Sequence, residues 1–219
     1  MAASTQDQIK RAAVRLFSER GFAATGIRDL ADAAGISTSA LYHYMGTKDE
    51  LLVDIMSEGL AVLNAQAEDA VAFSDRPEGR LGALIQRHVV MHARSPRTSL
   101  VIDNELRQLH GKALKKTIAQ RDAYEAHWAK AIADGAKAGV FTTPDERIAR
   151  LSLLELCTGV ARWYHPDGRM SVDAVCDVIG DLSLAMVRAT RGRKPVHFAD
   201  LGLPPAGEIV LEPASLVLA

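Results

Sequence analysis

The chain has 219 residues, of which 48% are hydrophobic, and its formal net charge is −1. A chain of this length can bury a substantial core in one or two domains, and its composition is that of a globular protein. No apolar run approaches the ~20 residues that span a bilayer, and the N-terminus lacks a signal-peptide pattern, so we expect a cytoplasmic protein without a membrane partner.

The first predicted helix begins after Ser4 or Thr5 and ends near Gly21. Thr5 and Gln8 fit a capping box. We expect Phe22 to pack against the apolar stripe of this helix. That stripe has helical spacing and consists of Ile9, Ala12, Ala13, Leu16 and Phe17.

Residues 25–48 predict two short helices joined by a tight turn. Thr25 is expected to cap the first helix by accepting a hydrogen bond from a free backbone N–H. Gly35 follows its last turn, where left-handed backbone favours glycine. Ser37 is expected to cap the second helix, residues 38–44. This is the helix-turn-helix layout, in which the second helix enters the DNA major groove.

Three motifs in this stretch carry a family resemblance: Ala-Ala-Gly-Ile-Ser at 33–37, Leu-Tyr-His-Tyr at 41–44 and Thr-Lys-Asp-Glu-Leu at 47–51. With Gly-Phe-Ala-Ala-Thr at 21–25, they closely resemble the TetR family of bacterial one-component regulators. The resemblance is strongest over roughly residues 5–60. It implies an all-α fold of about nine helices, with an N-terminal helix-turn-helix DNA-binding domain and a C-terminal helical ligand-binding and dimerisation domain. An ordinary helical hairpin in some other bundle stays the alternative.

The predicted DNA-binding residues are hydroxyl, aromatic and basic side chains: Thr25, Arg28, Ser37, Thr38, Ser39, Tyr42, His43 and Lys48. Thr38 and Ser39 lie at a helix N-terminus, where backbone N–H groups also favour a phosphate. The resemblance implies that Tyr42 and Lys48 contact phosphates, that Arg28 reaches a base edge or a phosphate, and that His43 faces the groove. The family often has Lys or Arg early in this helix, whereas this chain has Thr38, so the operator sequence stays open.

The first fifty residues do not have the basic excess that is typical of a nucleic-acid binder. Six acidic residues balance six basic ones. We therefore expect modest non-specific affinity, with a dimer supplying two contacts to DNA.

Further helices follow a capping box at Thr47 and Glu50. The first should reach about Val71, and after a break at 74–79 others are expected at about 81–94, 97–109, 112–137, 143–163 and 172–190. Pro144 is placed in a first turn and Ser171 at a cap. No β-strand is recognised. We divide the chain into a DNA-binding domain at 1–50, a ligand-binding and dimerisation domain at 51–191 and a C-terminal tail at 192–219.

The last two helices are apolar on more than one face, which indicates burial on several sides. We expect them to pair with their copies in a homodimer, as a four-helix bundle. The alternative is a monomer that buries both helices. The predicted dimer-interface residues are Leu156, Val160, Trp163, Val175, Ile179, Leu182 and Met186.

A basic cluster follows the last helix, formed by Arg188, Arg191, Arg193 and Lys194. Cations near a helix C-terminus complement the helix dipole, and we prefer this interpretation to a second DNA contact.

No enzyme signature is present, and we expect neither catalytic residues, nor a cofactor, nor a metal. His88 and His92 share a helix face and could form half of a metal site, but no third ligand stands at a recognisable spacing. Tyr124, His127 and Trp128 fit core packing or a pocket wall. Cys157 and Cys176 are interpreted as core thiols, with a thiol sensor as the alternative.

Three segments of the predicted ligand-binding domain, at 103–107, 121–125 and 162–168, look like a TetR subgroup that responds to acyl-coenzyme A thioesters of lipid or steroid catabolism. Arginines on the rim of an apolar cavity would suit the phosphates of such a ligand. The alternative is that Arg107, Arg121 and Arg162 form solvated salt bridges with Glu105, Asp122 and Glu125. The predicted ligand-binding residues are His88, Met91, His92, Leu106, Arg107, Arg121, Tyr124, Trp128, Leu154 and Arg162.

These patterns predict a ligand-responsive transcriptional regulator, a repressor that binds a palindromic operator as a homodimer. A small apolar effector, such as an acyl-CoA thioester, would release it from DNA. The alternative is a helical bundle with an enzymatic or a pure protein-interaction role. The ligand, the regulated genes, the direction of the ligand's effect and the role of the tail stay open.

Overall fold

The computed structural model describes residues 4–211 and confirms the all-α fold. Its α-helices are α1 (Thr5–Arg20), α2 (Ile27–Ala34), α3 (Thr38–Met45), α4 (Lys48–Ala72), α5 (Pro77–Arg94), α6 (Pro96–Asn104), α7 (Gly111–Lys137), α8 (Glu146–Thr158), the single turn α9 (Val160–Trp163) and α10 (Val172–Met186). Three 3₁₀ turns, η1 (Glu105–Gln108), η2 (Phe198–Leu201) and η3 (Ala206–Glu208), and two short strands, β1 (Thr190–Arg191) and β2 (Lys194–Pro195), complete the described chain. Among these residues no helix has both the length and the apolar character needed to cross a membrane.

The described chain forms two compact units. Unit 1 contains the described residues up to Val62, with Ser95–Arg121 and Leu211, and unit 2 contains Leu63–Arg94 and Asp122–Val210. Their bounds differ from the 1–50, 51–191 and 192–219 expected from the sequence. Residues 95–121 group with the N-terminal helices, and residues 192–210 group with unit 2.

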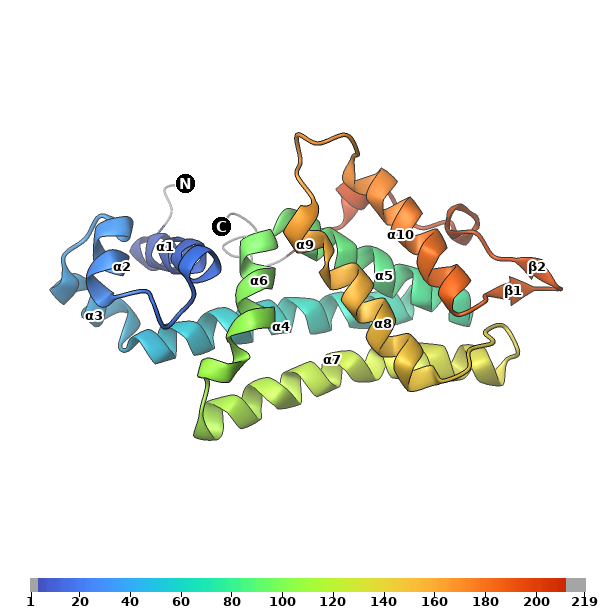
Figure 1. The fold of residues 1–219 in the computed structure, drawn as a ribbon, viewed down its shortest axis with the longest axis horizontal. Coiled ribbons are helices and arrows are strands. Elements are labelled where there is room, and N and C mark those ends of the chain that lie inside the picture. The colour runs from blue at the N-terminus through green and yellow to red at the C-terminus, as the bar shows by residue number, and fades with distance from the viewer. Residues whose placement is uncertain (1–3, 212–219) are drawn as a thin grey trace. The chain divides into compact units, whose positions relative to one another are not determined.

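Unit 1 is built around α1, which packs against α2, α3 and α6 (Figure 1). Its core includes Phe17, Leu30, Leu41 and Leu52, each with at most 1% of its surface exposed. Phe22 packs edge-on against Phe17 with ring centroids 5.2 Å apart, as predicted. This shared core fixes α2 and α3 on the platform that α1 provides.

One helix cap in unit 1 is confirmed, and two predicted capping contacts are wrong. Ser4, one of the two candidates, caps α1, but its capping box is completed by Asp7 and is not the predicted pair of Thr5 and Gln8. Thr25 does not cap α2, because its side chain is buried and its hydroxyl donates to the Gly21 carbonyl at 2.9 Å. The cap position therefore falls to Gly26.

Unit 2 is organised around α5, whose residues are buried on almost every side. It packs against α8, α9 and α10 (Figure 1). Asp145 caps α8 by accepting a hydrogen bond from the Ile148 amide at 2.8 Å. Pro144 therefore lies before the helix and not in its first turn, contrary to the prediction.

Helices α6 and α10 end earlier than the sequence predicted. α6 stops at Asn104 and continues as the turn η1, and α10 stops at Met186 because Arg188 adopts a φ of +50°.

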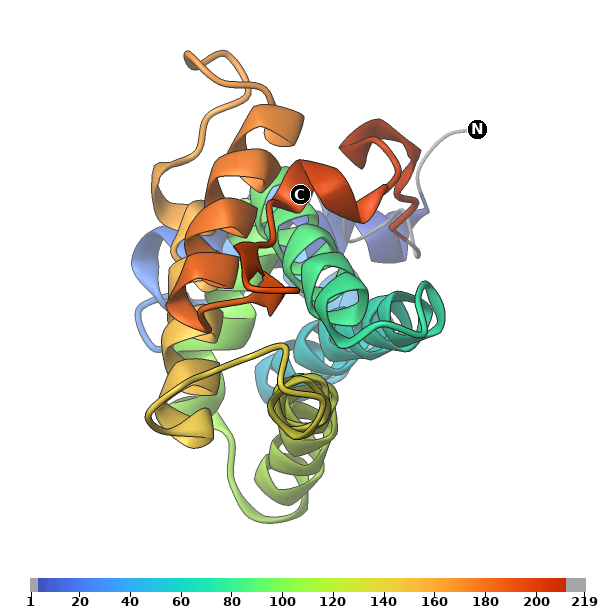
Figure 2. The same cartoon turned by 90° about the vertical axis from the view of Figure 1, so that its right-hand side faces the viewer.

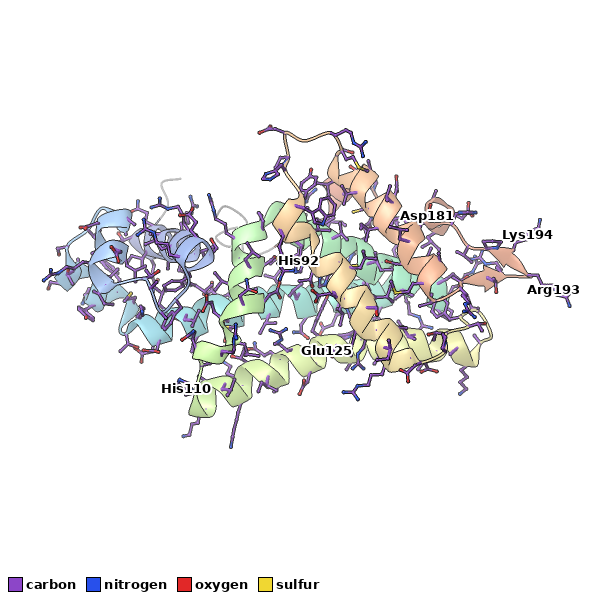
Figure 3. The ribbon with its side chains drawn as sticks, viewed as in Figure 1. His92, His110, Glu125, Asp181, Arg193 and Lys194 are labelled. Carbon is purple, nitrogen blue, oxygen red and sulfur yellow. The ribbon has the colours of Figure 1, made fainter. Side chains whose placement is uncertain are left out.

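After α10 the chain forms a short antiparallel hairpin that the sequence analysis missed. Thr190 pairs with Pro195 and Arg191 with Lys194. Gly192 and Arg193 both have positive φ, as in the tight turns that favour glycine in hairpins. Figure 3 shows Arg193 and Lys194 at the tip, pointing away from the helices.

The helix-dipole interpretation is wrong for Arg191. Its guanidinium donates to a carboxylate oxygen of Glu78 from Nη2 at 2.5 Å and from Nε at 3.1 Å. Glu78 is 3% exposed, so its buried charge is compensated by this partner from a distant part of the chain.

Residues 196–210 form a segment that we call the strap, which lies against α5 and α10 (Figure 2). Phe198 is buried in a space that the absence of a side chain at Gly180 leaves open, and Leu201 lies against Gly82 in the same way. The strap is thus an integral layer of unit 2. The remaining residues of the predicted tail, 212–219, lie outside the described residues.

Side chains of α5 and α10 hold the strap by its backbone. The carboxylate of Asp181 accepts from the Phe198 amide at 2.8 Å, and that of Asp173 accepts from the Ala206 amide at 2.6 Å. Gln86 donates to the Pro204 carbonyl at 2.7 Å. These peptide groups of the strap therefore find side-chain partners, although the strap contains only the two short 3₁₀ turns η2 and η3.

Candidate nucleic-acid interface

The turn between α2 and α3 has the geometry that the sequence predicted. Gly35 adopts φ +68° and ψ +30°, and its N–H reaches the last carbonyls of α2. The Ser37 hydroxyl accepts from the Ala40 amide at 3.1 Å and so caps α3. The two helices are therefore held in a helix-turn-helix arrangement by local backbone requirements.

Helix α3 has one buried side and one exposed side. Leu41 is fully buried and Met45 is 9% exposed, so both anchor α3 in the core of unit 1. Five other side chains of α3 are exposed to solvent: Thr38, Ser39, Tyr42 and His43, which helical spacing places on one face, and Tyr44, which lies beyond that face. Hydroxyl, imidazole and phenol groups on one helix face can hydrogen-bond to phosphates and base edges.

The remaining predicted DNA-binding residues lie in different environments. Arg28 is exposed in the first turn of α2. The Ser37 side chain serves as the α3 cap, and Thr25 is only 2% exposed. Lys48, at the start of α4, directs its ammonium at the carbonyls of residues between α1 and α2. Thr25 is thus part of the support of this surface and not of the surface itself.

Three acidic residues of unit 1 form hydrogen bonds at helix N-termini. Hydrogen bonds from the side chain and backbone of Ser4 lower the pKa of Asp7, and those from Thr47 lower the pKa of Glu50. Asp29 accepts from the Gly26 amide at 2.8 Å. Each carboxylate also complements the positive end of a helix dipole.

A basic groove in unit 1 was not foreseen from the sequence. Arg11 and Arg15 of α1 line it together with Arg97 of α6, along the end of α2. Arg97 lies 3.7 Å from the carboxylate of Glu19. The first fifty residues contain equal numbers of acidic and basic side chains, but the basic ones are unevenly distributed over unit 1. Arg97, from outside these fifty residues, adds to the basic groove.

In unit 2 a cluster of polar and aromatic side chains lies inside the helices. His88 Nδ1 is 2.7 Å from the Tyr124 hydroxyl, and His88 Nε2 is 3.0 Å from Thr158 Oγ1. The His92 ring stacks on the His88 ring, with ring centroids 4.0 Å apart. The fully buried Trp128 lies edge-on to the His88 ring, with ring centroids 5.6 Å apart. Burial, and secondarily the charge of His92, lowers the pKa of His88 well below its ordinary value. His88 is therefore a neutral imidazole between two hydroxyls.

This cluster does not make a metal site with neighbouring side chains. Within residues 4–211 no three His, Cys, Asp or Glu side chains are grouped so that they could hold a metal ion.

The structure brings together only some of the predicted ligand-binding residues. His88, Met91, His92, Tyr124 and Trp128 are all buried in unit 2. Leu154 is partly buried and Arg162 exposed in the same unit. Leu106, Arg107 and Arg121 belong to unit 1, where Arg121 donates to the Ile102 carbonyl at 3.2 Å.

The structure gives other partners to three of the residues in the alternative of solvated salt bridges. Arg162 lies 3.9 Å from Glu155, and Glu125 pairs with Arg150 at 3.4 Å. Glu105 accepts from the Phe22 amide at 3.3 Å.

The predicted dimer-interface residues divide into two sets. Val160, Val175 and Ile179 are at most 6% exposed and belong to the core of unit 2, which corrects their assignment to an interface. Leu156 is partly buried. Exposed apolar side chains remain on α8, α9 and α10. Three of them, Ile148, Leu151 and Val178, were not among the predicted interface residues. We call these side chains the exposed apolar face, which consists of Ile148, Leu151, Trp163, Val178, Leu182 and Met186, each 38–59% exposed.

The two cysteines are free and buried. Burial raises the pKa of Cys157 and of Cys176 to about 12. A thiol with so high a pKa is a poor nucleophile at neutral pH, which disfavours the thiol-sensor alternative.

Two family matches together cover most of the described chain. Residues 9–55 match "Bacterial regulatory proteins, tetR family", and residues 74–187 match "Tetracyclin repressor-like, C-terminal domain". The first match contains the helix-turn-helix, and the second ends one residue after α10.

Individual relatives agree with these matches. The chain is 28% identical over 165 residues to the HTH-type transcriptional repressor KstR2 of Rhodococcus jostii, covering 74% of this chain and 81% of the relative. It is 31% identical to the solved TetR family transcriptional regulator PfmR of Thermus thermophilus, with a TM-score of 0.72 over 84% of this chain and 98% of that one. AibR, solved in complex with isovaleryl coenzyme A and operator DNA, shares the fold at 23% identity with a TM-score of 0.74, over 82% of this chain and 97% of that one.

Proposed function

The chain belongs to the TetR family of bacterial regulatory proteins, and on this premise we propose that it is a repressor that binds palindromic operator DNA as a homodimer and is released by a small effector. The observation that carries the DNA-binding part is the exposed side of α3. Tyr42, 52% exposed, stands on this side while Leu41 beside it is fully buried, so the helix is anchored and its polar side is free.

The experiment is a fluorescence-anisotropy titration with duplexes from the DNA that flanks the protein's own gene. Tyr42→Ala should weaken specific binding about tenfold or more and leave the melting temperature nearly unchanged, because the side chain is half exposed. Tyr164→Ala, in unit 2, is the matched control and should bind like wild type. Wild-type affinity in Tyr42→Ala would contradict the placement of the DNA-binding surface.

The homodimer is supported by the exposed apolar face of α8, α9 and α10. Val178, Leu182 and Met186 recur every four residues and so share one face of α10, and exposed apolar side chains gathered on one face mark interaction sites. Two copies of the face can form a four-helix bundle about a two-fold axis. A dimer would also supply two recognition helices, which must lie about 34–36 Å apart to read successive major grooves.

Leu182→Glu tests this interface, since it would place two carboxylates near the axis of the proposed bundle. Sedimentation should show a shift from dimer toward monomer, with loss of operator binding. Ile118→Glu, at an exposed apolar position on α7, is the control and should stay dimeric. A wild-type protein that sediments as a monomer at micromolar concentration would refute the dimer.

For the effector we propose an apolar molecule with a carbonyl group, such as an acyl-CoA thioester. The buried polar cluster of His88, Tyr124 and Thr158, with Trp128 beside it, supports this, because its hydroxyl and imidazole groups could exchange their mutual hydrogen bonds for one to a carbonyl oxygen. AibR shows that the same fold accommodates a thioester of this class. The effector would release the protein by binding more tightly to a conformation that fits the operator poorly.

Native mass spectrometry of protein purified from its host would identify a co-purifying compound directly. Acyl-CoA thioesters of graded chain length, added to the anisotropy assay, should weaken operator binding, and His88→Gln should shift the concentration required. If no thioester changes operator affinity, the effector class is wrong while the DNA-binding function stands.

A further inference from the structure

We infer that the strap covers a ligand site, separate from the His88 cluster, which takes an organic ammonium compound with a short alkyl chain. The site is a cavity of about 390 Å³ between the strap and helices α5 and α10. This volume lies within the range of about 300–1,000 Å³ that is usual for small-molecule sites. The cavity is lined by Gln86, Asp173 and Asp177 from the helices and by Phe198, Leu203 and Pro204 from the strap.

Gln86 provides the observation that points to a ligand. Its side chain is 4% exposed and donates through Nε2 to the Pro204 carbonyl at 2.7 Å. Its oxygen Oε1 is buried and has no hydrogen-bond partner among the described residues. Because a buried acceptor without a partner costs free energy, this wall of the cavity favours an occupant that donates a hydrogen bond to Oε1.

The charged side chains of the cavity indicate the sign of that donor. Asp173 and Asp177 are exposed and lie one turn apart on α10, and none of the described residues that line the cavity is cationic. The start of α10 accounts for Asp173, which complements the helix dipole and accepts from the Ala206 amide at 2.6 Å. Asp177 lies one turn further along, where two like charges four residues apart repel each other. A cation beside these two carboxylates would offset that repulsion.

The thiol of Cys176 lies in the same negative field. Burial raises its pKa to about 12, and the charges of Asp173 and Asp177 add to this rise. Arg94 acts in the opposite direction. Its guanidinium, however, donates to the carbonyls of Ala206 at 2.6 Å and Ile209 at 2.8 Å, and so binds the end of the strap. The cavity therefore favours a positive charge.

An organic ammonium group fits these walls better than a metal ion does. Across residues 4–211 the His, Cys, Asp and Glu side chains form no group of three that could hold a metal ion. The side of the cavity that the strap provides is largely apolar, with Phe198, Leu203 and Pro204. An alkyl chain can pack against this side, while the ammonium N–H groups donate to Gln86 Oε1 and to a carboxylate at the exposed rim.

Such an occupant would contact α5, α10 and the strap at the same time. It would add to the hydrogen bonds that already hold the strap, from Gln86 to the Pro204 carbonyl and from the Ala206 amide to Asp173. A ligand that binds only the folded protein stabilises it increasingly as the ligand concentration rises. The attachment of the strap would therefore respond to the concentration of the amine.

The test measures binding of n-butylamine and 1,4-diaminobutane to the full-length protein by ligand-observed NMR, at constant pH and ionic strength. We expect saturable binding of these amines and no binding of n-butanol, which has the same chain length without the charge. Asp177→Asn should weaken amine binding about tenfold, as expected for the loss of one charge-assisted contact. Asp122→Asn removes the same charge from an exposed site on α7, outside the cavity, and should bind like wild type.

Hydrogen exchange provides a second measurement that needs no variant. The amides of Phe198 and Ala206 donate to the carboxylates of Asp181 and Asp173, and they exchange when the strap detaches. Both amides should exchange more slowly at saturating n-butylamine than without it. Unchanged exchange of both amides under these conditions would overturn the inference.

The NMR experiment can also overturn the inference in several ways. Amines that show no saturable binding, equal affinity of wild type and Asp177→Asn, or equal binding of n-butylamine and n-butanol would each do so. Saturable binding of Mg²⁺ without binding of either amine would assign the cavity to a metal ion and also overturn the inference. No DNA takes part in these experiments, so their outcome is independent of the proposed function.

Discussion

Replacing His88 by glutamine should remove a measurable part of the pH dependence of the protein's stability. Burial lowers the pKa of His88 well below 6.5, with a smaller effect from His92, so the folded protein keeps this imidazole neutral. The unfolded chain protonates it below about pH 6.5. The unfolded state then binds more protons, and the free energy of unfolding falls as the pH falls through this value.

The size of the effect follows from the linkage relation for one group. If His88 stays neutral in the folded state, a change from pH 7.5 to pH 5.5 lowers the free energy of unfolding by at most about 1.4 kcal/mol. Glutamine offers a donor and an acceptor to Tyr124 and Thr158 but does not titrate. The substitution therefore lowers the free energy of unfolding more at pH 7.5 than at pH 5.5, by up to about 1.4 kcal/mol, and the variant's stability depends less on pH than that of wild type.

The assay is urea unfolding at the two pH values, at one fixed protein concentration, so that the proposed dimerisation contributes equally to every measurement. Tryptophan fluorescence is a suitable signal, since the fully buried Trp128 lies 5.6 Å from His88. His110→Gln, at an exposed histidine, is the control and should behave like wild type. An equal pH dependence in wild type and His88→Gln would refute the reasoning.

Further predictions address helix capping, the strap and the cysteines. Ser37→Ala removes the α3 cap and should lower the free energy of unfolding by about 1 kcal/mol in chemical denaturation. Ser39→Ala, at an exposed position without this role, should lower it much less. Equal effects would contradict the capping assignment. Phe198→Ala should lower the free energy of unfolding by about 3–5 kcal/mol, because it removes the strap's buried ring from the core of unit 2. A loss within experimental error would show that the strap does not cover the core. Cys157 and Cys176, with pKa values raised to about 12, should resist a disulfide reagent at pH 8 until the protein unfolds, and rapid labelling of the native protein would show that they are accessible.

The features predicted correctly from the sequence are those that short-range rules determine. Gly35 was identified because a left-handed residue must end α2, and Ser37 because a hydroxyl there can cap α3. The same rules failed at Thr25, whose hydroxyl has a competing acceptor in Gly21. Its burial depends on the packing of the whole of unit 1, which spacing alone does not show.

The candidate site was predictable in its location but not in all its roles. Tyr42 and His43 are exposed on α3 because helical periodicity directs Leu41 inward. The partners of Lys48 are carbonyls more than twenty residues away, and Arg97 joins the basic groove from α6. Such contacts depend on tertiary structure and leave no local pattern.

The exposed apolar face of α8, α9 and α10 shows a different limit of prediction from sequence. Periodicity marks Val175 and Leu182 equally as apolar, although the structure buries the first and leaves the second 53% exposed. Apolar character does not tell whether a residue is covered by its own chain or by another.

The strap has a practical consequence for anyone who wants the second unit in isolation. A fragment excised at residue 187, where the family match ends, would contain every helix of that unit yet lack Phe198. The hollow beside Gly180 would open to water, and the carboxylates of Asp173 and Asp181 would lose the amides that they bind. Such a fragment should aggregate, and one extended to residue 211 should not.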